Sequence, residues 1–284
     1  MLGFYCINKP SGMGSTQVVS AVKRFTGAKC GHLGTLDPMA SGVLPVAVGK
    51  ATKLFDWFLT KDKKYFAIGL FGTLTDTLDA EGKITQKQEV NITKQQIDKV
   101  LDNFKGKISQ IPPLYSAVSV NGKKAYELAR DGQNIDLPTR NVSIYDLQCK
   151  TQISKNLFAF TVHCSAGTYI RTLINDIAKS VGTVATTVCI IRTDSGAFNI
   201  QNSNTIQELQ DGKASLIEVS QVINLPKINF NTTMANKLLN GQTLKIDYAN
   251  GDYLCYTNNS IMGIAKVNNT KIKLDINLWE NSND

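Results

Sequence analysis

Apolar residues recur every three or four positions in three stretches of the chain, and this spacing predicts three amphipathic α-helices. Ser15 is expected to cap the first helix, which ends at Gly27. Thr93 and Gln96 have the spacing of a capping box and open the second helix. The predicted apolar faces consist of Val18, Val19, Val22 and Phe25; Ile97, Val100, Leu101 and Phe104; and Ile170, Leu173, Ile174 and Ile177.

Short apolar or alternating runs predict strands between these helices. The clearest alternation covers residues 158–164, where every second side chain is apolar. Pro45 lies inside another apolar run and predicts a sheet edge or a bulge there, because proline lacks the N–H that a central strand donates. The remaining strands are expected over residues 4–7, 43–48, 65–71 and 184–191.

The composition changes after Leu225-Pro226, beyond which the chain is rich in asparagine. Turn signals recur there at a spacing that predicts short antiparallel strands in a small β-barrel. They are Asn240-Gly241, Asn250-Gly251, Asn258-Asn259 and Asn268-Asn269. We therefore expect an α+β protein with a mixed-sheet domain over residues 1–225 and a small barrel over residues 226–284.

Charge and cysteine usage narrow the class of protein. The 284 residues include 31 Lys and Arg against 23 Asp and Glu, a net charge of +8, which fits a polyanionic partner but is also common in proteins without one. The six cysteines contain no C-x-x-C pair, so we expect buried thiols and neither a disulfide framework nor a metal site. The sequence has no bilayer-spanning run and no signal-peptide pattern, which predicts a soluble cytoplasmic protein.

A glycine-rich loop over residues 31–42 carries the strongest candidate chemistry. Its three glycines allow a ligand to approach the main chain closely. Pro38 biases the preceding Asp37 toward an extended backbone, so the carboxylate is not expected in a helix. An Asp-Pro pair among glycines is commonly no more than a turn. Held on such a loop in front of an apolar strand, however, Asp37 is also a candidate reactive group.

The loop resembles the signature of the TruB family of tRNA pseudouridine-55 synthases, as does the Gly-Lys-Ala-Thr-Lys run over residues 49–53. Three further segments resemble motifs of this family: Lys9-Pro10-Ser11-Gly12, Gly167-Thr168-Tyr169-Ile170-Arg171 and the run 190–198. The sequence departs from the family at Gly14, where threonine is usual, and at Ile190, which replaces a leucine. Ile191 replaces a basic residue, which is expected to weaken one RNA contact.

The resemblance implies three catalytic residues. Asp37 matches the catalytic aspartate, Arg171 the arginine that pairs with it, and Tyr65 the tyrosine that stacks on the target base. A guanidinium can hold a carboxylate by two parallel bonds and keep it ionised. Without the resemblance, Arg171 would be taken for a solvated helix residue and Tyr65 for an ordinary core or rim residue.

The resemblance also implies four RNA-binding residues. Tyr169 and Ile190 would form walls of the base pocket. His32 would occupy the space that the flipped base leaves, although a lone histidine more often serves packing. Lys9 is included because it lies in the Lys9-Pro10-Ser11-Gly12 motif. The expected fold is a pseudouridine synthase domain followed by a PUA-like RNA-binding domain, for which the match is one of arrangement only.

The implied reaction breaks the N1–C1′ bond of uridine and rejoins the base through C5. One carboxylate can stabilise the electron-poor sugar carbon, whereas a hydrolytic glycosidase usually needs two. Because the reaction is an isomerisation, no cofactor is expected. The segment around Gly49-Lys50 is not a phosphate-binding P-loop, since its spacing is wrong and Ala51 follows the lysine.

The resemblance implies that the substrate is uridine-55 in the T-arm stem-loop of tRNA, modified without a protein partner. Two alternatives stay open. One is a guide-dependent H/ACA-type pseudouridylase, which shares the signature but tends to carry lysine-rich extensions. The other is an RNA-binding or tRNA-folding protein in which catalysis is secondary. The sequence leaves open whether Asp37 attacks C1′ or takes a proton from C2′, and also the oligomeric state.

Overall fold

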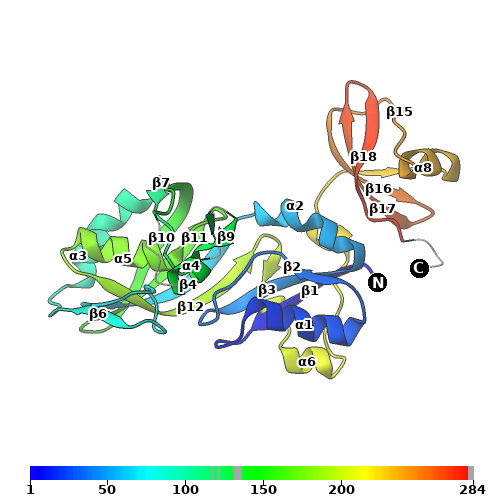
Figure 1. Cartoon of the computed structure of the whole chain (residues 1–284). Helices are drawn as coiled ribbons and strands as arrows, with labels where there is room; N and C mark the ends of the chain where they lie inside the picture. The colour runs from blue at the N-terminus through cyan, green and yellow to red at the C-terminus, as the bar shows by residue number, and fades with distance from the viewer. Residues whose placement is uncertain (117, 121, 131–135, 281–284) are drawn as a thin grey trace.

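The computed structural model describes residues 1–116, 118–120, 122–130 and 136–280. A nine-stranded sheet forms the larger part of the protein, and a five-stranded sheet stands at one end of it (Figure 1). Within the larger sheet, β3 (Ser41–Val48) and β12 (Ala185–Ser195) pair in parallel. The other neighbours pair in antiparallel fashion, so the predicted mixed sheet is confirmed.

The strand order of the larger sheet brings distant segments together. From one edge to the other it runs through β1 (Gly3–Lys9), β3, β12, β4 (Lys63–Phe71), β11 (Leu157–Cys164), β10 (Arg140–Ser154) and β7 (Gly106–Gln110), with β2 (Cys30–His32) on β3 and β13 (Phe198–Asn199) on β12. Short two-stranded pairs are formed by β5 (Thr73–Thr75) with β6 (Ile84–Lys87), and by β8 (Ser119–Val120) with β9 (Lys123–Lys124). The strand that follows the glycine-rich loop therefore lies beside β12, inside the sheet.

The three predicted helices form, with one change at an end. They are α1 (Ser15–Thr26), α3 (Lys94–Leu101) and α5 (Ile170–Ser180). Gly14, not Ser15, is the N-cap of α1, while Gly27 ends the helix in the left-handed conformation as expected. The capping box of Thr93 and Gln96 is confirmed. Because the cap does not use it, the Ser15 hydroxyl is free to bind elsewhere.

Helices cover the sheet around the candidate site. α5 packs over β4 and β12, and α3 lies beside α5 over β10 (Figure 1). The approach of α5 is close, since a Cβ on Gly69 of β4 would lie 2.6 Å from Ile174. The other helices of this part are short: α2 (Phe55–Leu59), α4 (Ala125–Arg130), α6 (Ile206–Gln210), α7 (Val219–Val222), and the 3-10 turns η1 (Gly49–Leu54), η2 (Asp102–Phe104) and η3 (Ile200–Asn202).

The prediction that Pro45 marks an edge or a bulge is wrong. β3 is an interior strand, and its antiparallel register with β1 runs without interruption past the Cys6–Pro45 pair. On its other side, β3 pairs with β2 near one end and with β12 near the other. Pro45 lies between these two ladders, where its carbonyl accepts from the N–H of Leu33 at 2.9 Å. The missing N–H therefore costs no ladder hydrogen bond with β2 or β12.

The second sheet contains β14 (Lys227–Asn229), β16 (Gly251–Thr257), β17 (Ser260–Asn268), β18 (Lys271–Asn277) and β15 (Leu244–Lys245), in that order. The hairpin turns between β16, β17 and β18 are confirmed, with positive φ at Asn258, Asn259, Asn269 and Thr270. Asn240-Gly241 instead ends a helix that the sequence did not predict, α8 (Thr232–Leu239). Among the described strands, β14 and β15 form the two edges without pairing to each other, so the sheet is open.

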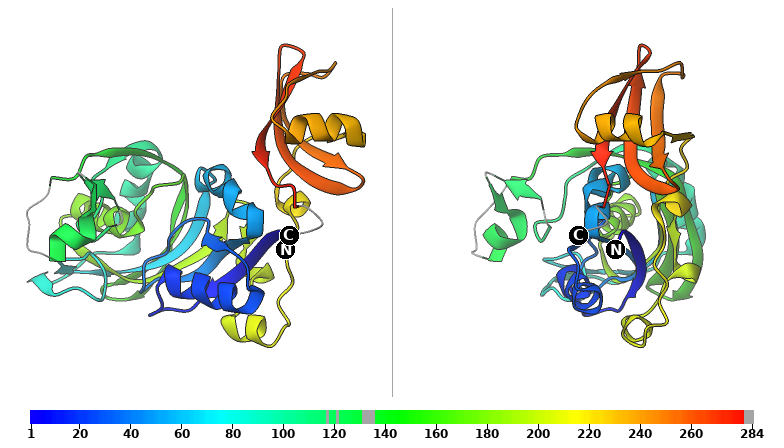
Figure 2. Two further views of the ribbon diagram at one scale, coloured as in Figure 1. Left: turned by 45° about the vertical axis from the view of Figure 1, so that its right-hand side comes forward. Right: turned by 90° about the vertical axis from the view of Figure 1, so that its right-hand side faces the viewer.

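The two parts of the protein share a hydrophobic core. Phe4, Leu54 and Phe58 of the first part cluster with Leu254 and Leu278 of the second. Close by, the side chains of two lysines in η1 donate to main-chain carbonyls at and after the end of β18, Lys50 to Trp279 and Lys53 to Asn277. The second sheet is attached at this junction and otherwise stands clear of the larger part (Figure 2).

Two expectations about the chain as a whole can be compared with the structure. All six cysteines are free; Cys30 and Cys189 are half-buried and the others are buried. Burial raises the pKa of Cys30, so its thiol is not activated. Among the described residues, no helix is long and apolar enough to cross a membrane.

Candidate active site

The glycine-rich loop is fixed from two sides. On one side, the Ser15 hydroxyl accepts from the N–H of Leu36 at 3.0 Å and donates to its carbonyl at 2.9 Å. On the other, the guanidinium of Arg192 in β12 donates to three main-chain carbonyls at 3.1, 3.2 and 2.8 Å, those of Gly34, Thr35 and Val43. Arg192 is 1% exposed. These bonds hold the loop against the centre of the sheet.

Gly42 allows β3 to reach β12 at the end of the loop. Its φ is +101°, and a Cβ there would lie 2.2 Å from the carbonyl oxygen of Arg192. Glycine alone tolerates both this backbone angle and this contact. The close approach sets the parallel register of Gly42 with Arg192 and so the position of the loop that precedes it.

Lys9 supports the loop from inside the protein and does not face solvent. It is fully buried, and its ammonium donates to the carbonyls of Pro10, Met13 and Pro38 at 3.0, 2.5 and 3.0 Å. Burial lowers the pKa of Lys9 to about 8, although the charge of Asp37 opposes this. All three N–H donors of the ammonium are used, so Lys9 has none left for RNA. Lys9 therefore positions the loop and does not make the predicted RNA contact.

Asp37 and Arg171 meet, as the resemblance implied. Arg171 Nη2 lies 2.9 Å from Asp37 Oδ2. Arg171, the second residue of α5, is 3% exposed, which excludes the alternative of a solvated helix arginine. The two terminal guanidinium nitrogens do not both bind Asp37, because Nη1 binds Asp79 Oδ2 at 3.0 Å.

Asp79 is a residue that the sequence analysis missed. It is 5% exposed, and its carboxylate also accepts from the Thr77 hydroxyl and from the N–H of Glu81. The Arg171 guanidinium also donates to the carbonyls of Thr77 and Tyr115 at 2.8 and 2.9 Å. The guanidinium is thus fixed by acceptors behind it and offers one corner to Asp37. The signal in the sequence is an aspartate shortly after a strand, which is too common to single out.

Some of the groups around Asp37 disfavour its ionised form and others favour it. Its side chain is 38% exposed. Enclosure by the surrounding protein raises the pKa of the Asp37 carboxyl, and the charge of Asp79 acts in the same direction, whereas Arg171 and Lys9 oppose the rise. An aspartate under such opposing influences is typical of functional sites.

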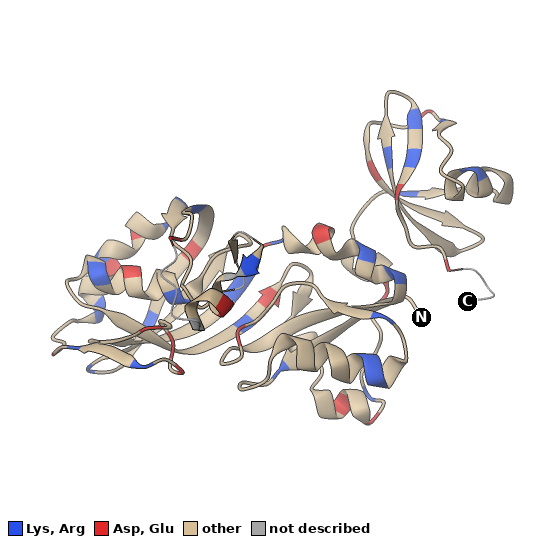
Figure 3. Cartoon of the chain, in the orientation of Figure 1, with Lys and Arg blue, Asp and Glu red and all other residues tan. Residues whose placement is uncertain are grey.

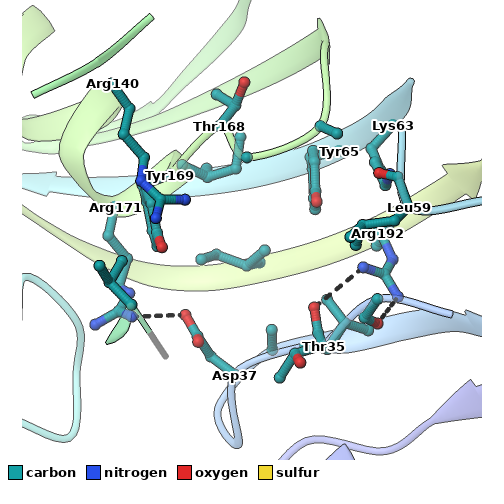
Figure 4. A pocket seen from close by; sticks show the side chains of 18 of the residues that line it. Thr35, Asp37, Leu59, Lys63, Tyr65, Arg140, Thr168, Tyr169, Arg171 and Arg192 are labelled. Atoms are coloured by element: carbon teal, nitrogen blue, oxygen red, sulfur yellow. Dashed lines mark hydrogen bonds and ion pairs between the residues drawn. The ribbon is translucent and has the colours of Figure 1, made fainter. Parts of the chain in front are cut away.

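A cavity of about 470 Å³ opens beside Asp37 (Figure 4). Tyr65 of β4, Tyr169 at the start of α5 and Ile190 of β12 all line it. Its wall also contains residues that the sequence analysis did not assign to the site, namely Leu59, Lys63, Arg140 and Arg192. The cavity therefore has a carboxylate at one end, and tyrosines, apolar side chains and cations in its wall.

Lys63 and Arg140 differ in how they face this cavity. Lys63 is buried, and its ammonium donates to the carbonyls of Leu59 and Lys61, which keeps the end of α2 against the cavity. Burial lowers the pKa of Lys63 to about 8, and the charge of Arg192 adds to this. Arg140 begins β10 and is exposed, so its guanidinium is available to an anionic ligand.

His32 does not line this cavity. It lines a second cavity of about 620 Å³, together with Asp79 and Tyr115. Asp37 and Arg171 line both cavities, so their ion pair lies in the wall between them. Burial lowers the pKa of His32, and the charge of Arg192 acts the same way, so the imidazole is neutral near pH 7. Its Nδ1 is buried and makes no hydrogen bond to any described residue.

Comparison with known proteins supports the motif assignment. The family described as TruB family pseudouridylate synthase (N terminal domain) matches residues 22–170. The tRNA pseudouridine synthase B of Caldanaerobacter subterraneus subsp. tengcongensis is 40% identical over 95% of this chain and 97% of that protein. The protein of the same name from Thermosipho melanesiensis is 36% identical over 98% of this chain and 95% of its own length.

Solved structures agree in fold. An H/ACA ribonucleoprotein bound to a substrate RNA containing 2′-deoxyuridine superposes with a TM-score of 0.70 at 23% identity, covering 99% of this chain and 86% of that one. A Cbf5-Nop10-Gar1 complex gives 0.67 at 25% identity, covering 93% and 78%. The family model matches just over half of the chain and the relatives cover nearly all of it, so the chain belongs to the TruB family of pseudouridylate synthases and is an isomerase.

Proposed function

We propose that this protein converts uridine-55 in the TΨC loop of tRNA to pseudouridine, with Asp37 as the catalytic carboxylate. The observation that carries the proposal is the cavity lined by Asp37, Tyr65, Tyr169 and Ile190, in which Asp37 contacts the buried Arg171. The choice of tRNA follows the names of the relatives, which are similar over nearly the whole chain.

The reaction requires one carboxylate to stabilise C1′ while the base is detached. The N1–C1′ bond breaks with its electron pair on N1. In one route Asp37 attacks C1′ and forms an ester; in the other it takes a proton from C2′ and later returns it. C5 then bonds to C1′; in the first route this breaks the ester and releases the Asp37 carboxylate with its electron pair. C5 loses its proton, and N1 gains one. Atoms and electrons balance in both routes without a co-reactant, so a single carboxylate suffices.

Arg171 and Asp79 prepare Asp37 for this task. Because Asp79 and two main-chain carbonyls fix the Arg171 guanidinium, the guanidinium cannot move with the Asp37 carboxylate. It therefore holds Asp37 in a fixed direction. We assign Arg171 to orienting Asp37 and favouring its ionised form. Asp79 acts through Arg171 and is a positioning residue.

The remaining residues fit an extruded nucleotide. A uridine must leave the RNA stack before its C1′ can be reached, and an aromatic side chain stabilises the flipped base. We assign this stacking to Tyr65, with Tyr169 and Ile190 as further walls. The neutral imidazole of His32, in the neighbouring cavity, is assigned to the space that the base leaves in the RNA loop.

We assign residues 1–225 to the catalytic domain and residues 226–284 to a PUA-like RNA-binding domain. The open five-stranded sheet with α8 supports this division, since it has a core of its own beyond the shared junction. In this assignment the protein acts in the cytoplasm on the T-arm alone, with neither a guide RNA nor a protein partner.

The test uses an unmodified T-arm hairpin with the purified full chain. We expect pseudouridine at one uridine when the product is mapped. Opening the stem by mutation should abolish the reaction, and compensatory base pairs should restore it, because loop shape rather than duplex sequence is recognised. Asp37→Asn serves as the matched inactive control.

Guide dependence is the second candidate, because H/ACA-type pseudouridylases share the catalytic signature. An isolated hairpin that stays unmodified until a guide RNA is added would establish this candidate. Tight RNA binding without any product would instead favour an RNA-folding protein.

A further inference from the structure

Gln110 lines neither of the two cavities, but it holds the main chain of a residue that lines the first. It is the last residue of β7 and is 1% exposed. Its side-chain oxygen accepts from the N–H of Tyr169 at 3.0 Å, and its side-chain nitrogen donates to the carbonyl of the same residue at 3.3 Å. We call these two hydrogen bonds the Gln110 clamp. The clamp uses both ends of the amide, so only glutamine in this orientation satisfies both main-chain groups.

The Gln110 clamp takes the place of a helix cap. Tyr169 is the N-cap of α5, and its side chain makes no capping hydrogen bond. In a capping box, the side chain of the third helical residue accepts from the N–H of the N-cap. In α5 that residue is Thr172, whose hydroxyl instead donates to the carbonyl of Ile111 at 3.2 Å. The acceptor for the Tyr169 N–H therefore comes from β7, and Gln110 fixes the point at which α5 begins.

Two side chains of the candidate site depend on where α5 begins. Tyr169 lines the cavity, and Arg171 follows two residues later with its guanidinium on Asp37. Figure 4 shows both side chains on one side of the cavity, with Arg171 turned toward Asp37. Gln110 is also the cross-strand partner of Arg140, which lines the same cavity. A shift at the start of α5 would therefore move a wall of the cavity and the partner of Asp37 together.

We propose that Gln110 is a positioning residue for the reaction, because its clamp sets the start of α5 and with it the places of Tyr169 and Arg171. Gln110 is too deeply buried to touch the substrate and acts through these two residues. The inference rests on the proposed function for the reaction that is positioned. A displacement of about 1 Å can cost about a hundredfold in rate even when it starts far from the reacting atoms. Loss of the clamp should therefore lower kcat more than it weakens the binding of RNA.

A matched pair of variants tests the proposal. Gln110→Met removes the clamp and keeps a side chain of similar length. The control is Gln152→Met on β10, because the Gln152 amide makes bonds of the same kind away from both cavities. It accepts from the N–H of Lys94 at the start of α3 and donates to the carbonyls of Ile92 and Lys155. Both variants keep the charged positions shown in Figure 3, so the electrostatic attraction of RNA is the same.

Gln110→Met should lower kcat on unmodified tRNA about tenfold or more, with little change in affinity. The control should keep the wild-type kcat when both are measured below their unfolding transitions. Gln110→Asn keeps the amide on a side chain one methylene shorter, so it should give an intermediate kcat; it supplies the test if the methionine variant does not fold. Wild-type kcat in the folded variant would overturn the inference, as would an equal loss in the control.

Titration of Asp37 in the RNA-free protein, followed by carboxyl-carbon NMR, tests the positioning without turnover. Enclosure and the charge of Asp79 raise the pKa of Asp37, whereas Arg171 and Lys9 lower it. Because loss of the clamp moves Arg171 away, the pKa of Asp37 should rise in Gln110→Met and stay unchanged in the control. An unchanged pKa in Gln110→Met would contradict an action through Arg171. A wild-type protein that forms no pseudouridine would overturn the proposed function instead, and this titration would still decide the inference.

Discussion

The guanidinium of Arg171 lies 2.9 Å from the carboxylate of Asp37 while it is itself 3% exposed. Its other bonds go to Asp79 and to two main-chain carbonyls, so the arginine is fixed before any RNA arrives. Asp37 is the exposed member of the pair, with 38% of its side chain accessible. Because one partner is fixed and the other is open to substrate, mutations at each should have different effects.

Asp37→Asn is expected to lower turnover roughly a thousandfold or more, because the amide keeps the shape but cannot stabilise the developing charge at C1′. Affinity for tRNA should change little, since phosphate contacts supply most of the binding energy. Single-turnover formation of pseudouridine and equilibrium binding measure the two effects. Substantial turnover by the sequence-verified variant would remove Asp37 from the mechanism.

Asp79→Asn is expected to lower turnover about 10- to 100-fold, because Arg171 loses the carboxylate that fixes it and Asp37 is less well oriented. Single-turnover rates on tRNA provide the measurement. Asp76→Asn, close in sequence, is the control, since its carboxylate accepts from the N–H of Lys83. Equal losses in both variants would point to a general disturbance of this segment.

The pH dependence of turnover follows from the direction of the Asp37 shift. A raised pKa means that the carboxylate is lost on acidification at a higher pH than for an ordinary aspartate, so the acid limb of the rate should lie above the usual aspartate range. The charge of Asp79 contributes to this rise in pKa. In Asp79→Asn, the limb should therefore move to lower pH. A limb that stays in place or moves upward would contradict the assigned coupling.

Gly42→Ala should destabilise the protein by about 3 kcal/mol or more, because the φ of +101° and the contact with the Arg192 carbonyl both oppose a Cβ. Gly27→Ala is the matched control: its φ is +65°, but the space around it is open. That change should cost only about 1 kcal/mol. Urea unfolding of both variants separates close packing from backbone strain, and equal losses would show that strain alone matters.

The sequence predicted the fold well wherever structure is set locally. The apolar face of α5 and the asparagine turns of the second sheet needed only spacing and turn chemistry. Pro45 was misjudged because its place depends on where two other strands end, which no local pattern encodes. The helix α8 was missed because Asn240-Gly241 suits a helix end as well as a hairpin.

Prediction of the candidate site was limited in the same way, because local patterns do not encode tertiary contacts. Motifs identified Asp37 and Arg171, and the structure places them in one ion pair. The buried polar residues around them depend on tertiary contacts. Arg192 lies in the run 190–198, to which the sequence analysis gave no role at this position, although a charge inside an apolar strand indicates that it is paired. Lys9 could not be recognised as buried until its three carbonyl partners were assembled.

The core shared by the two parts has a consequence for synthesis of the chain on the ribosome. Phe4 in β1 emerges early, yet it belongs to the same buried cluster as Leu254, Ile264 and Leu278. Domains generally fold in order as they emerge, and apolar surface that stays uncovered invites misassembly. The part of this cluster that the second sheet covers, at η1, must therefore wait, uncovered, until nearly the whole chain has been translated. Release of the finished chain and closure of this junction are thus coupled in time.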